Sequence, residues 1–205
     1  MSTATAQPWL AQYPEGTPAT INTDEFRSVA DVMKVAFDRF RHRPAFVNMD
    51  KVMSYGDLDQ ASLRFGCFLR NHLGLKKGDR VAIMLPNVLQ YPVALLGILR
   101  AGLTVVNTNP MYTARELKHQ LNDSGAAAIV VLENFATTLE EVLKDTSVKH
   151  VITSAVGDML GFPKSLVVNF VVKYRKKAVP AFNLPNAIKF NDALRQGAGQ
   201  SLRAT

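Results

Sequence analysis

The sequence predicts an α/β fold: a doubly wound, mainly parallel sheet flanked by helices, with a small amino-terminal hairpin. Between residues 80 and 154, short and almost wholly apolar segments alternate with stretches of helical spacing, which is typical of a parallel sheet covered on both faces. Ser54 and Thr113 each precede a helical stretch with an acidic residue three positions later, the pattern of an N-terminal capping box. With 205 residues, of which 47% are hydrophobic and 20% charged, the chain can form one substantial core.

The amino-terminal part is expected to hold an irregular leader, two helices and the hairpin. Residues 1–25 are small, polar and proline-bearing, and they lack the basic start and apolar core of a secretory signal. Ser28 and Asp31 have the spacing of a capping box for the first helix, and Asp57 completes the box that Ser54 begins for the second. The expected elements are a helix over 28–41, strands over 45–49 and 51–54 around Asp50, and a helix from Ser54 that stops at Gly74.

Strands and helices alternate from Arg80 onward, and successive right-handed crossovers would place the strands side by side. Residues 26–160 are therefore assigned to one α/β subdomain. The expected strands cover 81–85, 104–107, 127–132 and 150–153. The expected helices cover 89–100 and 135–144, and a third helix is expected between them. Thr113 and Glu116 would cap the start of this third helix, and Gly125 would follow its end.

Beyond Ser154 this alternation is lost. Residues 161–180 are interpreted as an apolar and basic insertion. Residues 181–205 contain one short helical stretch at 191–195 and fade into glycine, serine and alanine, so they are interpreted as a linker toward further protein. No uninterrupted apolar run approaches the roughly 18–20 residues that span a bilayer, so any membrane contact is expected to be peripheral.

The net charge of the chain is compatible with several classes of binding partner and does not distinguish among them. A formal charge of +7 and a pI near 9.6 suit nucleic acid, an anionic membrane or anionic small molecules such as nucleotides and CoA. Nucleic acid is disfavoured, because the basic residues are spread over several helices and no aromatic stacking platform accompanies them. Cys67 is the only cysteine, so no intrachain disulfide can form, which fits a reducing cytoplasm.

The common catalytic and phosphate-binding motifs are absent, and the four histidines lie in separate predicted elements. No catalytic residue and no metal ligand are therefore expected in this chain. Two loops follow the carboxyl ends of predicted strands, where doubly wound sheets bind ligands. The alternative is that asparagine and proline only form the turns there. The candidate substrate-pocket residues are Pro86, Asn87, Asn107, Asn109, Tyr112 and Thr113.

Several segments in these loops and elements resemble a known family. Three segments, in this order and spacing, resemble the early region of adenylate-forming (AMP-binding) enzymes: SYGDLD, KGDRVAIMLPN and LRAGLTVVNTNPMYTARELKHQLNDSGA. That family includes acyl-CoA synthetases, luciferases and peptide-synthetase adenylation domains. Bacterial long-chain fatty-acid CoA ligases in particular resemble this chain in NTNPMYT and in NFVVKYRKK. The resemblance covers essentially the whole chain and identifies it as the amino-terminal portion of such a ligase.

The resemblance implies a two-step reaction that serves fatty-acid degradation or lipid synthesis. ATP and a long-chain fatty acid form an acyl-adenylate with release of pyrophosphate, Mg²⁺ is required, and the thiol of CoA then displaces AMP. The family's phosphate loop, nucleotide contacts and carboxyl-terminal lysine have no counterpart in these residues. The chain alone is therefore expected to be inactive and to bind none of ATP, CoA and Mg²⁺.

The segment 162–178 suggests a second function, that of a non-catalytic module that binds the surface of the inner membrane. Its apolar residues would insert shallowly while its basic residues meet anionic lipid. The alternative is an ordinary buried strand or helix with a solvated basic end. Apolar surface left by a sheet cut from a larger domain also makes a homodimer an open alternative. The membrane-contact candidates are Phe170, Lys173, Tyr174, Arg175, Lys176 and Lys177.

Overall fold

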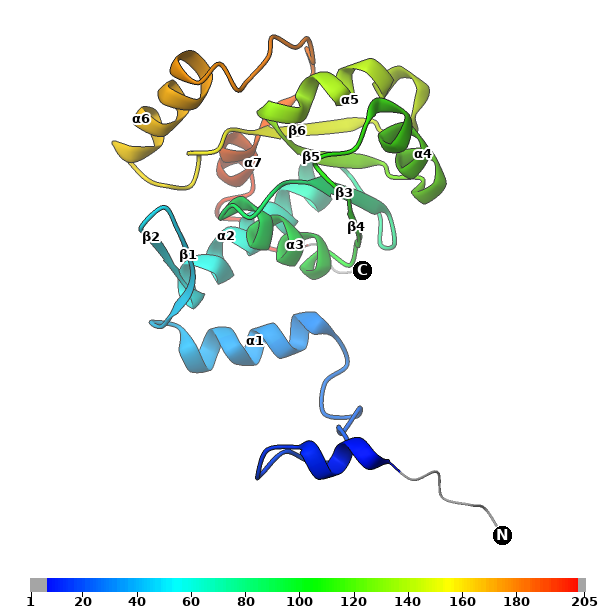
Figure 1. Ribbon diagram of the computed structural model, residues 1–205, viewed down its shortest axis with the longest axis vertical. Helices are drawn as coiled ribbons and strands as arrows, with labels where there is room; N and C mark the ends of the chain where they lie inside the picture. Colours follow the sequence, from blue (N-terminus) through cyan, green and yellow to red (C-terminus); the bar gives the residue numbers. More distant parts are fainter. Residues whose placement is uncertain (1–6, 203–205) are drawn as a thin grey trace.

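The computed structural model describes residues 7–202, so the first six residues of the predicted leader lie outside it. The described part of the leader contains one short 3-10 helix, Pro8–Gln12. Helix α1 (Val29–Phe40) follows, and both lie below the main body in Figure 1. Ser28 Oγ accepts a hydrogen bond from Asp31 N at 3.1 Å, but the reciprocal bond of the predicted capping box is not formed. Ser28 therefore caps the helix alone.

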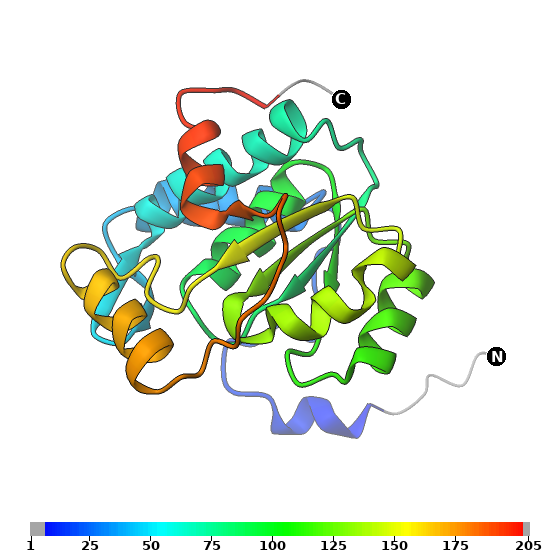
Figure 2. The ribbon, with the colours of Figure 1, turned by 90° about the horizontal axis from the view of Figure 1, so that it is seen from above.

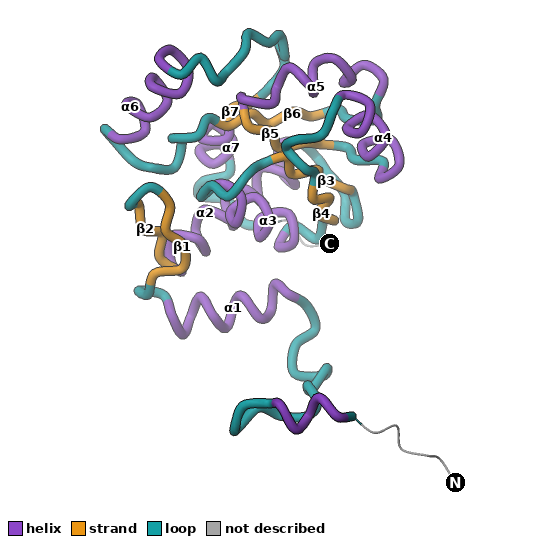
Figure 3. Tube along the Cα trace, viewed as in Figure 1, coloured by secondary structure: helices purple, strands orange, loops and turns teal. Residues whose placement is uncertain are grey.

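The predicted hairpin is confirmed. Strands β1 (Pro44–Asn48) and β2 (Lys51–Ser54) pair antiparallel, with Asn48 opposite Lys51. Met49 and Asp50 form the connection, with φ angles of 47° and 58°. Positive φ at both central residues matches the right-handed twist of the two strands. Figure 3 shows that this hairpin is separate from the main sheet.

The main sheet is five-stranded and parallel, which confirms the predicted α/β class. Its spatial order is β4-β3-β5-β6-β7, so the chain first winds from β3 to one side and then returns to the other. The strands are β3 (Arg80–Met84), β4 (Thr104–Asn107), β5 (Ala128–Leu132), β6 (His150–Ser154) and β7 (Ile188–Lys189).

Helices cover both faces of this sheet and create two cores (Figure 2). One face carries α2 (Tyr55–Cys67), α3 (Gln90–Arg100) and α7 (Phe190–Gln196), and the other carries α4 (Ala114–Ser124) and α5 (Ala136–Val142). Strand β5 is buried along its whole length. Because side chains alternate along a strand, Val130 enters the first core and Ile129 and Val131 the second.

The two predicted capping boxes that begin α2 and α4 are both formed. Asp57 N donates to Ser54 Oγ at 3.1 Å, and Ser54 N donates to Asp57 Oδ2 at 3.0 Å. Helix α2 then continues through one π turn, Phe68–His72, before the chain turns at Gly74. Gly125 ends α4 in the left-handed conformation with φ 60°, as its position predicts.

Part of the predicted linker, 181–205, belongs to the folded body instead. Ile188 pairs with Ile152, which places β7 beside β6. Phe190 is fully buried, and its ring lies 5.0 Å from that of Phe65 on α2. A strand of two residues has no periodicity to detect, so sequence patterns could not reveal it.

Residues 162–178 contain helix α6 (Lys164–Phe170), extended by a π turn, Val171–Arg175. Neither element has a fully buried residue. Val168 nevertheless packs against the first core, and Val171 and Val172 are half-buried, so the segment is a half-buried helix with an exposed basic end. Within the described part of the chain, no helix has both the length and the apolar character needed to cross a membrane.

Candidate functional site

The two candidate loops emerge from the same edge of the sheet. Strands β3 and β4 are parallel neighbours, and Ile83 pairs with Asn107. The loop at Pro86 and Asn87 follows β3, and the loop that leads to Thr113 follows β4. Both loops therefore lie at the carboxyl ends of adjacent strands, the edge where ligands bind in doubly wound folds.

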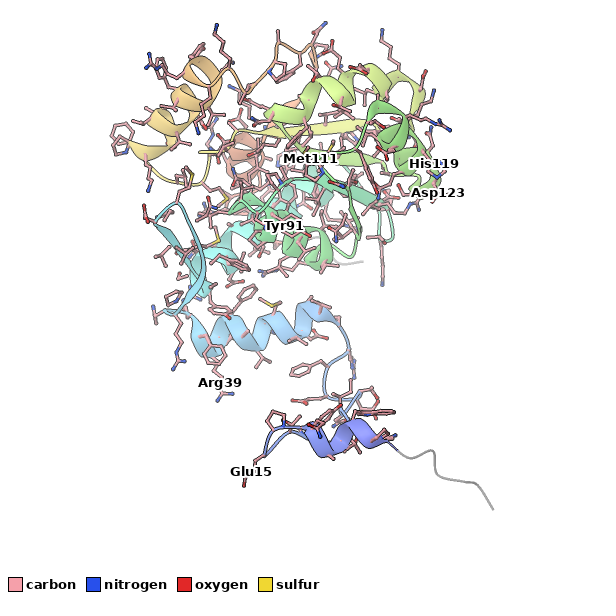
Figure 4. The ribbon with its side chains drawn as sticks, in the orientation of Figure 1. Glu15, Arg39, Tyr91, Met111, His119 and Asp123 are labelled. Carbon is pink, nitrogen blue, oxygen red and sulfur yellow. The ribbon has the colours of Figure 1, made fainter. Side chains whose placement is uncertain are left out.

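Asn107 is held by two neighbouring side chains. Tyr91 Oη donates a hydrogen bond to Asn107 Oδ1 at 2.9 Å, and Gln120 Nε2 donates to Asn107 O at 2.9 Å. Tyr91 lies on α3, beside the loop after β4 (Figure 4). Gln120 Oε1 is buried without a hydrogen-bond partner among the described residues. This network fixes the end of β4 against α3 and α4.

The remaining polar side chains of the second loop form local structure. Asn109 Oδ1 accepts from Met111 N at 3.0 Å, which closes an Asx turn. Thr113 Oγ1 accepts from Glu116 N at 3.4 Å, while Glu116 Oε2 accepts from Thr113 N at 2.8 Å. Hydrogen bonds from the Thr113 backbone and hydroxyl lower the pKa of Glu116. Tyr112 is half-buried and packs against the second core.

The first loop faces the hairpin instead of the second loop. Asn48 Nδ2 donates to Asn87 O at 3.2 Å, and Pro86 O accepts from Val88 N at 2.8 Å. A small cavity of about 170 Å³ lies between the hairpin and α3, lined by Asn87 and Tyr91 but by none of Asn107, Asn109 and Thr113. Ligand pockets usually hold about 300–1,000 Å³, so these loops do not close a small-molecule site by themselves.

A third group of polar side chains at this edge was missed by sequence reasoning. Glu133 follows β5 directly, and Asp158 lies shortly after β6. With Asn169, Lys173 and Lys189 they line a cavity of about 200 Å³ beneath α6. Burial raises the pKa of Glu133, the nearby Asp158 carboxylate raises it further, and Lys173 and Lys189 oppose this change. The available signal was a carboxylate placed immediately after a buried strand.

A cavity of about 870 Å³ lies away from this edge. Its lining includes Val148 and Lys149, which immediately precede β6, and the segment 183–187 that precedes β7. It therefore opens near the amino ends of the strands, where doubly wound folds do not bind their ligands. Its volume alone does not make it the candidate site.

The histidines and the cysteine have separate environments. His119 lies on the outer side of α4 (Figure 4), whereas His72 Nε2 contacts Gln196 O at 2.9 Å. Burial, and secondarily Lys149, lowers the pKa of His150, and burial raises the pKa of the Cys67 thiol. Within residues 7–202, no three His, Cys, Asp or Glu side chains are grouped closely enough to hold a metal ion.

Comparison with known proteins places this architecture in a family. The model of the family described as AMP-binding enzyme matches residues 33–194. The long-chain-fatty-acid CoA ligase of Salmonella typhimurium is 57% identical over 189 residues, covering 92% of this chain and 34% of that protein. The ligase of the same name from Haemophilus influenzae is 50% identical over the same share of the chain. The chain thus spans about a third of the length of these relatives.

Solved structures share the fold. A long-chain-fatty-acid CoA ligase from Archaeoglobus fulgidus aligns with a TM-score of 0.58 and 27% identity, covering 69% of this chain and 29% of that one. A benzoate CoA ligase from Burkholderia xenovorans aligns with a TM-score of 0.63 and 18% identity, covering 86% of this chain and 30% of that one. Together with the family match over 33–194, the sheet order and the capped helices, this shows that the chain belongs to the AMP-binding enzyme family.

Proposed function

We propose that this chain is the amino-terminal scaffold of a long-chain fatty-acid CoA ligase. The observation that carries the proposal is the 50–57% identity, over 92% of the chain, to ligases of that name. In the proposed reaction, a fatty-acid carboxylate oxygen attacks the α-phosphorus of ATP, and pyrophosphate leaves. The thiol of CoA, losing its proton, then attacks the acyl carbon and releases AMP.

Two of the helices that cover the sheet do not offer free N-termini to ATP phosphates. Helix N-termini bind phosphate through free backbone amides, but the carboxylates of Asp57 and Glu116 sit at those of α2 and α4. No group of three metal-ligating side chains exists among the described residues. Nucleotide, metal and CoA binding are therefore proposed for the longer protein, and this chain contributes the sheet and the loops at its edge.

Within that protein, the loops at Asn87 and Asn107 would form one wall of the substrate pocket. The bond from Tyr91 to Asn107, the Asx turn at Asn109 and the Thr113 cap keep this wall rigid. A rigid edge positions groups without contributing a nucleophile or a base. Loss of the Tyr91 hydroxyl in Tyr91→Phe would therefore raise KM more than it lowers kcat.

The test is pyrophosphate release by the full-length protein with ATP and a palmitate-like acid, followed by detection of AMP and acyl-CoA after CoA addition. We expect release to require both ATP and the fatty acid. The 205-residue chain alone is expected to release none. Full-length activity that is independent of fatty acid would overturn the substrate assignment, and activity of the short chain would overturn the scaffold role.

A second function, docking on the anionic inner surface of the membrane from the cytoplasm, is supported by α6. Phe170 and Tyr174 are 56% and 61% exposed, and Lys173, Lys176 and Lys177 are exposed beside them. We expect the chain to float with anionic vesicles, and a variant with these three lysines changed to Glu to remain behind. Equal flotation of both proteins would overturn electrostatic docking. Size-exclusion chromatography without vesicles shows separately whether the chain self-associates as a homodimer.

A further inference from the structure

Helix α6 is attached to the body through Asn169 and the half-buried Val168, while a second set of apolar side chains points to solvent. Asn169 Oδ1 accepts from Gly157 N at 2.7 Å, and Asn169 Nδ2 donates to Asp158 Oδ1 at 3.1 Å. A surface helix normally turns its apolar face inward and a polar face outward, but α6 is apolar on its outer side as well. The outward apolar side chains here are 56–85% exposed: Phe162, Leu166, Val167, Phe170 and Tyr174.

The hairpin β1–β2 also exposes apolar side chains. Val47 and Val52 are cross-strand partners and are 63% and 46% exposed. The neighbouring position Met53 points to the other face and is buried. Met49 adds an exposed apolar side chain at the turn. One face and the tip of the hairpin therefore carry exposed apolar side chains, of which Val47 also lines the small cavity shared with α3.

Lys164 joins these two segments. Its Nζ lies 3.3 Å from Asp50 Oδ2 and also contacts Met49 O, so the hairpin turn meets the start of α6. Figures 1 and 2 show both segments on the same side of the molecule. Of the sixteen large hydrophobic side chains exposed in the described chain, nine belong to these two segments. Lys164 thus joins two segments more than 100 positions apart, each of which exposes apolar side chains.

The charges around this surface favour anionic lipid. Residues 162–178 contain five basic and no acidic side chains, and Lys51 adds a cation at the hairpin turn. The only carboxylate in the hairpin is that of Asp50, which is paired with Lys164. The ring centroids of Tyr174 and Phe170 lie 5.2 Å apart, and Lys173 Nζ lies over the Tyr174 ring, 5.8 Å from its centroid. Aromatic and basic side chains of this kind are enriched at membrane interfaces.

We propose that the hairpin β1–β2 and α6 form one composite lipid-binding surface, in which Val47, Val52 and Met49 enter the lipid together with the α6 aromatics. The proposal rests on the membrane docking proposed for α6 and extends it to a second element. The helical stretch 164–175 is about 18 Å long, against roughly 30 Å for a bilayer core, so it lies in the interface plane. Two elements in one plane fix the orientation of the sheet relative to the membrane.

The experiment measures binding of the 205-residue chain to phosphatidylglycerol–phosphatidylcholine vesicles, with phosphatidylcholine vesicles as reference. The hairpin variant is Val47→Ser with Val52→Ser, and the helix variant is Phe170→Ser with Tyr174→Ser. The matched control is Val29→Ser with Val35→Ser on α1, where the valines are 58% and 50% exposed outside the composite surface. We expect each of the first two variants to bind roughly tenfold more weakly and the control to bind like the parent.

The outcomes separate the two proposals. Weak binding by the helix variant with parental binding by the hairpin variant would overturn the composite surface and leave docking by α6 intact. Parental binding by both would overturn docking itself. If the hairpin variant instead abolishes self-association in sedimentation while vesicle binding is unchanged, the face belongs to a second copy of the chain.

A direct probe keeps the test independent of folding defects. Val47→Trp is placed in a Trp9→Phe background, which removes the only natural tryptophan. We expect its emission to shift to the blue with anionic vesicles and to be quenched by brominated acyl chains. Absence of both changes in a variant that binds vesicles would overturn insertion of the hairpin.

Discussion

Gly66 on α2 and Gly97 on α3 lie so close together that neither helix has room for a side chain at the contact. A Cβ built on Gly66 would lie 2.9 Å from Gly97 O, and one built on Gly97 would lie 2.9 Å from Ser62 O. Real Cβ atoms essentially never approach backbone oxygen this closely. The two glycines therefore set the distance between the helices that cover the first core.

Gly97→Ala is expected to lower the free energy of unfolding by about 1–3 kcal/mol, because the helices must separate to admit the methyl group. Urea denaturation of the 205-residue chain measures this. Gln60→Ala on the exposed side of α2 is the control, with an expected change within about 0.5 kcal/mol. A Gly97→Ala protein as stable as the parent would contradict the close packing.

Arg100 joins α3 to α2 through one carboxylate. Its Nη1 lies 2.6 Å from Asp59 Oδ1 and also donates to Asp59 O at 2.9 Å and Ser62 Oγ at 3.0 Å. Asp59→Ala would leave a largely buried guanidinium with fewer partners, so we expect a loss of about 1–3 kcal/mol. Thermal or urea unfolding measures the loss. Asp145→Ala breaks the exposed pair with Lys118 and is expected to cost less.

Local signals explain what could be predicted from the sequence. The capping boxes at Ser54 and Thr113 and the end of α4 at Gly125 depend on residues three to twelve positions apart, and the structure forms all of them. The buried strands β3 and β5 were equally evident, since each is an apolar run longer than any loop would carry. Element type and order within 54–154 therefore followed from the sequence.

What could not be predicted depends on contacts between distant segments. The orientation of α6 is set by the bonds that Asn169 makes to Gly157 and Asp158 and by the packing of Val168 on the first core. The sequence of a helix that is apolar on both sides does not show which side faces the body. The cavity beneath α6 is lined by both Glu133 and Lys189, which are 56 positions apart in the sequence. The candidate residues Asn109 and Thr113 are engaged in local turns, which a sequence reading cannot separate from ligand contacts.

Phe190 tests whether the carboxyl-terminal region is part of the core. Its ring is fully buried against Phe65, and the residue follows the two-residue strand β7. Phe190→Ala is expected to cost about 3–5 kcal/mol, the usual range for truncation of a buried aromatic ring. The control Phe162→Ala removes a ring that is 85% exposed and is expected to leave stability unchanged. Equal stability of both variants would mean that residues 181–205 act as a linker and do not belong to the core.

Glu133 predicts a particular dependence of stability on pH. Burial raises its pKa above the ordinary value of 4.5 in the folded chain, with a further increase from Asp158. Between the unfolded and folded pKa values, the folded state binds more protons, so the free energy of unfolding falls as pH rises through this window. Above the window, the unfavourable burial of the charge is fully present, and below it both states are protonated.

Glu133→Gln removes this titration. At pH 7 the variant is expected to be more stable than the parent, and the difference should vanish below about pH 4. Urea denaturation at both pH values measures it, with Glu15→Gln on the exposed leader (Figure 4) as a control that changes the charge equally. A variant less stable than the parent at pH 7 would mean that attraction to Lys173 and Lys189 outweighs the desolvation of the carboxylate, reversing the order of the two effects.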